Sequence, residues 1–268
     1  MDKIIKRRLM EEMTVKDMRE ALKETRTVLV PLGVVEQHGY HLPLSTDIIN
    51  AYEVSKRVSE KTGAVVAPPM SYSFSGGTLP GTINITPQVM ALVVMDICRS
   101  LIQQGFKNIV LVQGHGGTEN CNALKDCTIL FLRQNPQYSD VVLALTGVAD
   151  FSKTWMGAFK KHDFHAALIE TSVIMYWRPE LVRKEMVTDE PKLARALRVH
   201  QDNYMKITKP IDSPFVIPFI KQRPEMKVGV MGDPKGANAK LGRKVSDESV
   251  AGMTRFIKRI EARSSWKR

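Results

Sequence analysis

Acidic and histidine side chains are concentrated in one short segment of the chain. Glu36, His38, His41 and Asp47 all lie within it. The segment follows an apolar run, residues 27–33, which is typical of a buried strand. In α/β proteins, ligands bind beyond the carboxyl ends of the strands. We therefore expect this segment to form part of a functional site.

Carboxylate oxygens and neutral imidazoles are common ligands of divalent metal ions. Glu36 and His38 are two residues apart, so in an extended segment both side chains point the same way. Asp47 could bridge two ions with its two oxygens, or it could simply cap the helix predicted to follow it. His115 ends another apolar run between glycines, and Glu170 lies on a later predicted helix. These five residues are the candidate ligands of a metal centre.

The chemistry that such a centre supports is hydrolysis. Two neighbouring metal ions can share a water, lower its pKa and polarise a carbonyl group. Two alternatives remain open. Each histidine taken alone could be a hydrogen-bonded structural residue. The segment Gly114–Gly117 could bind a phosphate at a helix N-terminus, although it lacks the spacing of a dinucleotide fingerprint and the Lys-Ser/Thr of a P-loop.

Strand and helix patterns alternate along the first two thirds of the chain. Each predicted strand is apolar almost throughout, which predicts a parallel sheet covered by helices on both faces. We expect one domain over residues 1–268, with a helical lead-in over 1–26 and a looser pattern after Pro179. The predicted strands are 27–32, 64–69, 107–113 and 141–145, and the predicted helices are 48–60, 87–104, 118–133, 165–177 and 248–262.

The composition is that of an ordinary globular protein, with 268 residues, 43% hydrophobic and 25% charged. Cys98, Cys121 and Cys127 do not form a C-x-x-C pair, which indicates thiols in a reducing compartment. The N-terminus lacks the apolar core of a signal peptide, and no apolar run is long enough to span a bilayer. We therefore expect a cytoplasmic protein with no membrane contact.

The net charge of +11 could indicate a nucleic-acid partner. The basic residues are spread along the chain, with small clusters at 6–8, at 258–259 and 263, and at 267–268. No recognition motif and no interleaved aromatic run accompanies them. We therefore expect a solvated basic surface and a small-molecule substrate instead of nucleic acid.

Five segments, in order along the chain, resemble the creatininase (creatinine amidohydrolase) family. The first is the longest and most specific. They are Pro31-Leu32-Gly33-x-x-Glu36-Gln37-His38-Gly39-x-His41-Leu42-Pro43-x-x-x-Asp47, Pro80-Gly81-Thr82, Gly114-His115-Gly116-Gly117, His165-Ala166 with Glu170-Thr171-Ser172, and Gly232-Asp233-Pro234. The resemblance extends over most of the chain, from about residue 27 to residue 250.

The resemblance implies a three-layer α/β/α fold with a mostly parallel sheet and two divalent metal ions, zinc, manganese or iron. It implies that Glu36, Asp47 and His115 hold one ion and that His38, Asp47 and Glu170 hold the other. His165 would move a proton near the leaving group. His41 would lie behind the metal ligands and orient them through its ring N–H. The family also implies a homo-oligomer, often a hexamer.

Several positions depart from the family pattern. Gln113 and Thr118 stand where Asn is usual, Ala167 replaces a Gly, and Gly117 stands where true creatininases carry a Glu. A Ser-rich loop, residues 71–78, stands where a His is usual. Ser73 and Ser75 of this loop, together with Gly116 and Gly117, are expected behind the ligands or against the substrate. Glu119 is a weaker candidate ligand than Glu170.

We predict a metal-dependent hydrolase in which an activated water attacks a carbonyl of a small cyclic substrate, with amidohydrolase-type C–N cleavage. Hydrolytic ring opening of an inositol-derived cyclic diketone is the alternative, favoured by the serine hydroxyls. A non-catalytic metabolite-binding protein on the same fold is a further alternative. The segment 150–164, with Trp155 and Lys160-Lys161-His162, is either a lid over the site or an ordinary exposed loop.

Overall fold

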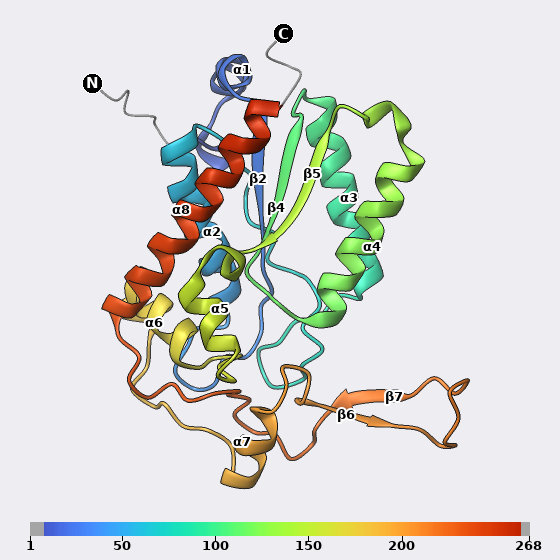
Figure 1. Cartoon of the computed structure of the whole chain (residues 1–268), viewed down its shortest axis with the longest axis vertical. Helices are drawn as coiled ribbons and strands as arrows, with labels where there is room; N and C mark the ends of the chain where they lie inside the picture. The colour runs from blue at the N-terminus through green and yellow to red at the C-terminus, as the bar shows by residue number, and fades with distance from the viewer. Residues whose placement is uncertain (1–7, 264–268) are drawn as a thin grey trace.

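A five-stranded parallel sheet forms the centre of the computed structural model, which describes residues 8–263 (Figure 1). The strand order is β1-β3-β2-β4-β5, and each pair of neighbours is parallel. The predicted α/β class with a parallel sheet is confirmed. The short β1 was not predicted. The strands are β1 (Arg8–Leu9), β2 (Thr27–Leu32), β3 (Val65–Val66), β4 (Asn108–Gln113) and β5 (Val142–Gly147).

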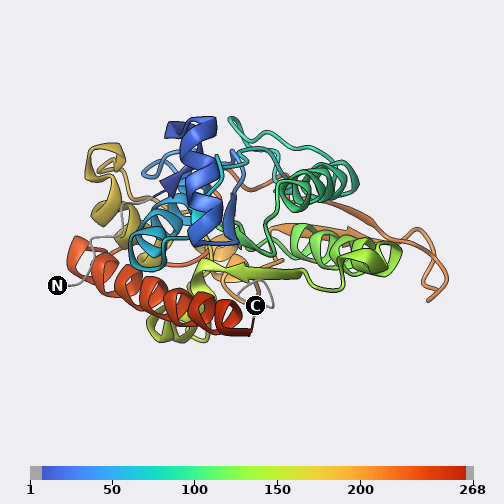
Figure 2. The same ribbon diagram turned by 90° about the horizontal axis from the view of Figure 1, so that it is seen from above.

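Helices cover both faces of this sheet and give the expected three layers (Figure 2). Side chains of β2 alternate between the two layers, since Leu29 packs on one side and Val28 and Val30 pack on the other. The first side has α2 (Thr46–Thr62), α5 (Lys153–Phe159), α6 (Leu168–Trp177) and α8 (Ala239–Arg263), and the second has α1 (Val15–Glu24), α3 (Pro87–Gln103) and α4 (Thr118–Gln134). Short 3₁₀ segments lie at Met10–Glu12, Pro136–Tyr138, Val148–Phe151 and Pro179–Leu181.

The order of the strands creates a crevice between β2 and β4. The chain leaves β2 into α2 on one face of the sheet, and it leaves β4 into α4 on the opposite face. Ligands of open α/β sheets bind at such a switch point, beyond the carboxyl ends of the strands. Leu32 and Gln113 are register partners at these two ends. The residues that follow them are therefore neighbours in space.

Local sequence signals set most helix boundaries, but three helices begin elsewhere than predicted, among them α2, which begins at Thr46 instead of residue 48. Thr14 and Asp17 form the expected capping box of α1. Helix α6 begins at Leu168 instead of residue 165, because the Asp163 carboxylate accepts hydrogen bonds from the Leu168 and Ile169 amides. Helix α8 begins at Ala239, nine residues before the predicted start, where Asn238 accepts a hydrogen bond from the Leu241 amide.

The loosely patterned region after Pro179 contains structure that the sequence did not predict. It holds α7 (Pro191–Leu197) and an antiparallel hairpin formed by β6 (Met205–Thr208) and β7 (Phe219–Gln222). Figure 1 shows the hairpin projecting sideways from the body of the molecule. The chain then returns through residues 226–234 to the carboxyl edge of the sheet, where Met231 bridges His165.

In residues 8–263, no helix combines the length and apolar character that crossing a bilayer requires. Arg8 forms an ion pair with Glu24. Lys258, Arg259 and Arg263 lie on α8 and are exposed, whereas Lys6, Arg7, Lys267 and Arg268 lie outside the described residues.

Candidate metal centre

The first turn of α2 lies directly against the ends of β2 and β4. A Cβ atom at Gly114 would overlap the backbone carbonyl of Asp47, and one at Gly33 would lie 2.7 Å from the Ile48 amide nitrogen. This close approach places Asp47 between the two strand ends. Ser45 occupies the N-cap position, and Asp47 lies inside the first turn with its carboxylate directed at two histidines. The alternative role of Asp47, as the cap of this helix, is therefore wrong.

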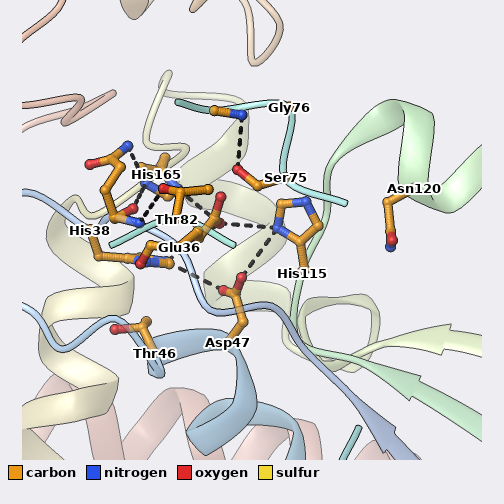
Figure 3. Close-up of polar contacts among 12 residues, drawn as sticks. Glu36, His38, Thr46, Asp47, Ser75, Gly76, Thr82, His115, Asn120 and His165 are labelled. Carbon is orange, nitrogen blue, oxygen red and sulfur yellow. Dashed lines mark hydrogen bonds and ion pairs between the residues drawn. The ribbon is translucent and has the colours of Figure 1, made fainter. Parts of the chain in front are cut away.

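One group of possible ligands comprises Glu36, Asp47 and His115 (Figure 3). His115 Nδ1 lies 3.1 Å from Glu36 Oε1 and 3.2 Å from Asp47 Oδ2. All three residues are buried. Three ligand atoms at this separation can converge on a single ion, with further positions left for water or substrate.

A second group comprises His38, Asp47 and Glu170. His38 Nε2 lies 3.3 Å from Asp47 Oδ1 and 3.8 Å from Glu170 Oε2. The other ring nitrogen of His38, Nδ1, lies 3.2 Å from the Glu36 carbonyl oxygen, which can only accept a hydrogen bond. Nε2 is consequently the atom left for a ligand. The two groups share Asp47 through its two different oxygens. Figure 3 shows Glu36, His38, Asp47 and His115 turned toward a common centre.

The chemistry of this cluster matches what divalent cations require. Glu36, Asp47 and Glu170 bury three carboxylates together, which is unfavourable unless positive charge lies between them. Glu36 Oε1, His38 Nε2 and Asp47 Oδ2 are buried atoms that make no hydrogen bond. Metal ions would satisfy both the charges and the free lone pairs. The residues present therefore fit a pair of divalent ions.

Without metal, protons take the place of the missing positive charge. Burial alone would lower the pKa of His38, but the carboxylates of Asp47, Glu170 and Glu36 outweigh it and raise that pKa to about 10. Burial is likewise outweighed at His115, where Glu36 and Asp47 raise the pKa well above its usual value. Burial raises the pKa of Glu170 to about 7. Both imidazoles are thus protonated at neutral pH in the metal-free protein.

Metal binding at pH 7 is expected to release more than two protons, because Glu170 is partly protonated at that pH and because His38 and His115 must each lose a proton to become ligands. Since both pKa values are raised, metal affinity should increase as the pH rises from 7 toward 10. Titration calorimetry in two buffers of different ionisation enthalpy would measure the release. The same heat in both buffers would contradict the prediction.

His165 lies beside the two groups but outside the helix predicted to contain it. Its Nε2 lies 2.8 Å from the Gln37 carbonyl oxygen, which can only accept a hydrogen bond, and 3.1 Å from the Gln37 side-chain nitrogen. The shorter contact favours the tautomer that carries the proton on Nε2 and the free lone pair on Nδ1. Nδ1 lies 3.8 Å from Glu36 Oε1. Burial, reinforced by the neighbouring His38, lowers the pKa of His165 to about 4. A neutral imidazole with an inward lone pair can accept a proton in this cavity.

The ligand groups open into a cavity of about 420 Å³. Its walls include Ser75 from the 71–78 loop, His115 from the segment after β4, Trp155 from α5 and His165 from the segment before α6. The volume suits a small molecule. A cavity lined by Glu36, Asp47, His115 and Glu170 together with the neutral His165 can support hydrolysis of a carbonyl compound.

A family model described as creatininase, creatinine amidohydrolase, matches residues 11–257. The chain belongs to the creatininase family. It is therefore a hydrolase of that family with buried His, Glu and Asp side chains as candidate metal ligands.

Curated relatives of this chain have different activities. A mycofactocin precursor peptide peptidase of Mycolicibacterium smegmatis is 30% identical over 249 residues, covering 87% of this chain and 84% of that protein. A creatinine amidohydrolase of Pseudomonas putida is 29% identical over 181 residues, covering 61% of this chain and 69% of that protein. A 3-dehydro-scyllo-inosose hydrolase of Thermotoga maritima is 26% identical over 191 residues, covering 68% and 60%.

Solved creatininases have the same fold. One described as a manganese form superposes with a TM-score of 0.74 at 23% identity, covering 96% of this chain and 98% of that one. A mutant form of Zn–Zn type gives 0.72 at 24% identity, covering 94% and 97%. The likeness to these structures shows the fold, and the arrangement of the ligand groups fits a site for two metal ions.

The remaining predicted site residues take different positions. His41 is fully buried and its Nε2 lies 2.9 Å from the hydroxyl of Thr171, next to Glu170. Gly116 and Gly117 both line the cavity. A Cβ atom at Gly117 would overlap the His115 ring, whereas one at Gly116 would meet nothing within 4 Å. Gly117 therefore makes room for His115.

The two serines of the 71–78 loop differ in their surroundings. Ser75 lines the cavity, and its Oγ accepts a hydrogen bond from the Gly77 amide. Ser73 is buried, its Oγ makes no hydrogen bond, and it lies outside the cavity lining. Glu119 is also directed elsewhere, with Oε2 3.4 Å from the Tyr204 hydroxyl.

Sequence reasoning missed a cavity wall contributed by the region after α7. Gln201, Asp202 and Tyr204 line the cavity, and Asp202 accepts a hydrogen bond from Thr118 Oγ1 at 2.9 Å. No motif in this irregular segment could have identified them. Trp155 is buried in the wall, while Lys160-Lys161 is an exposed turn.

Proposed function

We propose that this protein is a two-metal amidohydrolase that cleaves the C–N bond of a small, uncharged cyclic amide. The observation that carries the proposal is the pair of buried ligand groups that share Asp47 at the base of the cavity. One ion would be held by Glu36, Asp47 and His115, and the other by His38, Asp47 and Glu170. When bound, the ions would activate a water and polarise the substrate carbonyl.

The protein's own residues would supply the proton transfer and the orientation. The inward Nδ1 of His165 would take a proton from the water and return it to the departing nitrogen. The Gln37 carbonyl holds the imidazole in the tautomer that this role needs. His41 would fix the segment that carries Glu170 through its contact with Thr171.

The charge of the cavity supports an uncharged substrate. The chain has 39 Lys and Arg residues, yet among the described residues that line the cavity there is neither a lysine nor an arginine. Asp150 and Asp202 add carboxylates to the wall. A substrate carboxylate would find no cationic side chain there, which disfavours trimming of a peptide at its free C-terminus.

A substrate panel would test this function. Metal-loaded protein is incubated with creatinine, other cyclic amides, formamido compounds and peptides with a free C-terminus, and mass spectrometry follows gain of water or loss of formate. We expect turnover of an uncharged amide and none of the peptides. Turnover of a peptide and of no other compound would overturn the assignment. If metal-loaded protein converts none of the compounds, the substrate lies outside these classes.

Ring opening of an inositol-derived cyclic diketone is the second candidate. Ser75, Gln201 and Asp202 give the wall several hydrogen-bonding groups that suit a polyhydroxylated ring. Such a diketone belongs in the same panel. If it is the substrate, Ser75→Ala should lower kcat/KM, while Ser73→Ala should not, since Ser73 lies outside the cavity lining. Equal activity of wild type and Ser75→Ala would remove the support from Ser75.

His165→Gln is expected to lower kcat by about 10²- to 10⁴-fold, the usual contribution of a positioned acid–base group. Metal content should stay unchanged, because neither proposed ion depends on His165. Metal analysis beside the kinetics separates the two roles. Loss of one ion together with the activity would instead make His165 a ligand, in line with its grouping with Glu36 and His38.

We further propose that the enzyme is a cytoplasmic homo-oligomer, with a hexamer as one possible form, and that its ions are zinc, manganese or iron. Cys98, Cys121 and Cys127 carry free thiols, as a reducing compartment requires. Metal analysis of protein purified without added metal, together with its native mass, would test these assignments.

A further inference from the structure

The cavity beside the candidate metal ligands is larger than an unsubstituted small ring needs. Its volume is about 420 Å³, and cavities of roughly 300–1,000 Å³ take drug-sized ligands. A small cyclic amide held at the ions would therefore leave part of the space to water. Water against apolar side chains is unfavourable, so a substrate group that displaces it stabilises the complex. The side chains around the remaining space thus indicate what the substrate carries beside its ring.

One side of the cavity is built from apolar side chains, which we call the apolar wall. Trp155 and Phe159 belong to α5 and pack with the hydrophobic core beneath α8. The rings of Phe159 and Phe164 are stacked, with centroids 6.4 Å apart. Phe164 packs in turn against the cluster that contains Met226 and Met231. The apolar wall is therefore continuous, and it consists of Val148, Trp155, Phe159, Phe164, Met226 and Met231, all of which line the cavity.

The apolar wall begins at the end of the cavity where the reaction would take place. Phe164 precedes His165, and the Phe164 amide donates a hydrogen bond to the Met231 carbonyl oxygen at 3.0 Å. Met231 also pairs with His165 in an antiparallel bridge. His165 Nδ1 lies 3.8 Å from Glu36 Oε1, which belongs to one of the ligand groups. A group attached to a ring bound at the ions would therefore reach Phe164 and Met231.

The polar side chains of the cavity offer less to a substrate, because they bond partly to one another. Gln201 Nε2 donates a hydrogen bond to Thr118 Oγ1 at 2.9 Å, and Thr118 Oγ1 donates one to the Asp202 carboxylate at 2.9 Å. Asp150 is exposed, and its carboxylate accepts a hydrogen bond from the Gly147 amide at 2.7 Å. The unfilled binding capacity of the cavity therefore lies mainly on the apolar wall.

We propose that the substrate is a cyclic amide that carries a benzyl-sized apolar group, and that the apolar wall binds this group. The inference rests on the proposed amidohydrolase function and adds the substituent to it. Aromatic groups pack well against the rings of Trp155, Phe159 and Phe164 in stacked or edge-on geometry. The flexible thioethers of Met226 and Met231 adapt to the shape of such a group. Hydroxyl groups of a substrate would find no hydrogen-bond partner on this wall.

Hydroxamic acids test the apolar wall without any need for turnover, because they chelate divalent metal ions through both of their oxygens. The probes are acetohydroxamic, phenylacetohydroxamic and glycolohydroxamic acid, which end in a methyl, a benzyl and a hydroxymethyl group. Titration calorimetry with metal-loaded, full-length protein gives the three affinities. We expect the benzyl probe to bind at least about tenfold more tightly than the methyl probe, as is usual for an added apolar group in a hydrophobic pocket. The hydroxymethyl probe should bind no more tightly than the methyl probe.

Two variants connect this difference to the apolar wall. Phe159→Ala removes a ring from the wall, and Ala149→Phe fills space beside Val148, since Ala149 is half-buried and lines the cavity. Both should largely abolish the ratio between the affinities of the benzyl and methyl probes. The matched control is Phe215→Ala, because Phe215 is 92% exposed between β6 and β7 and lies outside the cavity lining. This control should keep the wild-type ratio.

Several outcomes would overturn the proposal. Equal affinity of the methyl and benzyl probes would do so, as would tighter binding of the hydroxymethyl probe than of the benzyl probe. A wild-type ratio in both Phe159→Ala and Ala149→Phe would place the benzyl group away from the apolar wall. The proposed function fails in a different way. Metal-loaded protein that binds the benzyl probe tightly through this wall, but hydrolyses no benzyl-substituted cyclic amide, would contradict the amidohydrolase reaction and leave the apolar binding site standing.

Discussion

Asp47→Ala is expected to remove both metal ions and to abolish hydrolysis. Asp47 is the residue shared by the two ligand groups, with Oδ1 near His38 and Oδ2 near His115. Substitution of a residue that only hydrogen-bonds to a metal ligand usually lowers metal affinity or activity by about 10- to 100-fold. Loss of a bridging ligand should therefore lower kcat/KM by at least about a thousandfold, because the ions supply the activated water.

Metal content by mass spectrometry and the rate with the substrate identified from the panel would measure this effect. Asp47→Asn keeps the size of the side chain, so it separates the loss of charge from the loss of packing in the first turn of α2. Asp247→Ala is the matched control, since Asp247 is an exposed helix carboxylate paired with Arg243. Two ions retained in Asp47→Ala would contradict the shared-ligand arrangement, and retained activity without metal would contradict the two-metal function itself.

Gly114→Ala is expected to lower the free energy of unfolding by about 3 kcal/mol, the upper end of the usual cost of overpacking. The added Cβ would overlap the backbone carbonyl of Asp47. A backbone atom cannot rotate away as a side chain does, so α2 would have to move from the ends of β2 and β4. That displacement would also separate Asp47 from His115 and weaken metal binding.

Gly116→Ala provides the control, because a Cβ there would meet nothing within 4 Å. Its free energy of unfolding should stay within about 0.5 kcal/mol of the wild type. Chemical denaturation of both variants, with and without a chelator, gives the comparison. Equal stability of the two would show that the close contact at Gly114 relaxes without cost. A single cooperative transition in the wild type would also support the expectation of one domain over residues 1–268.

The predicted candidate ligands lie together because the sequence pattern determines the sheet. The apolar runs at 27–32 and 107–113 predict adjacent parallel strands, and parallel strands present their carboxyl ends at one edge. Glu36 and His115 follow these two strands, so their convergence was predictable. The roles of the individual residues, and the identity of the ions, stay predictions.

The sequence by itself determined the family, the α/β class and the list of candidate ligands, because these depend on local apolar periodicity and on residues in a fixed order along the chain. Other features required the tertiary structure. The role of Asp47 depended on the packing of α2 against Gly114, the tautomer of His165 depended on the Gln37 carbonyl, and the exposure of Phe215 depended on where its hairpin projects. Each results from contacts between residues far apart in the sequence, which no local pattern encodes.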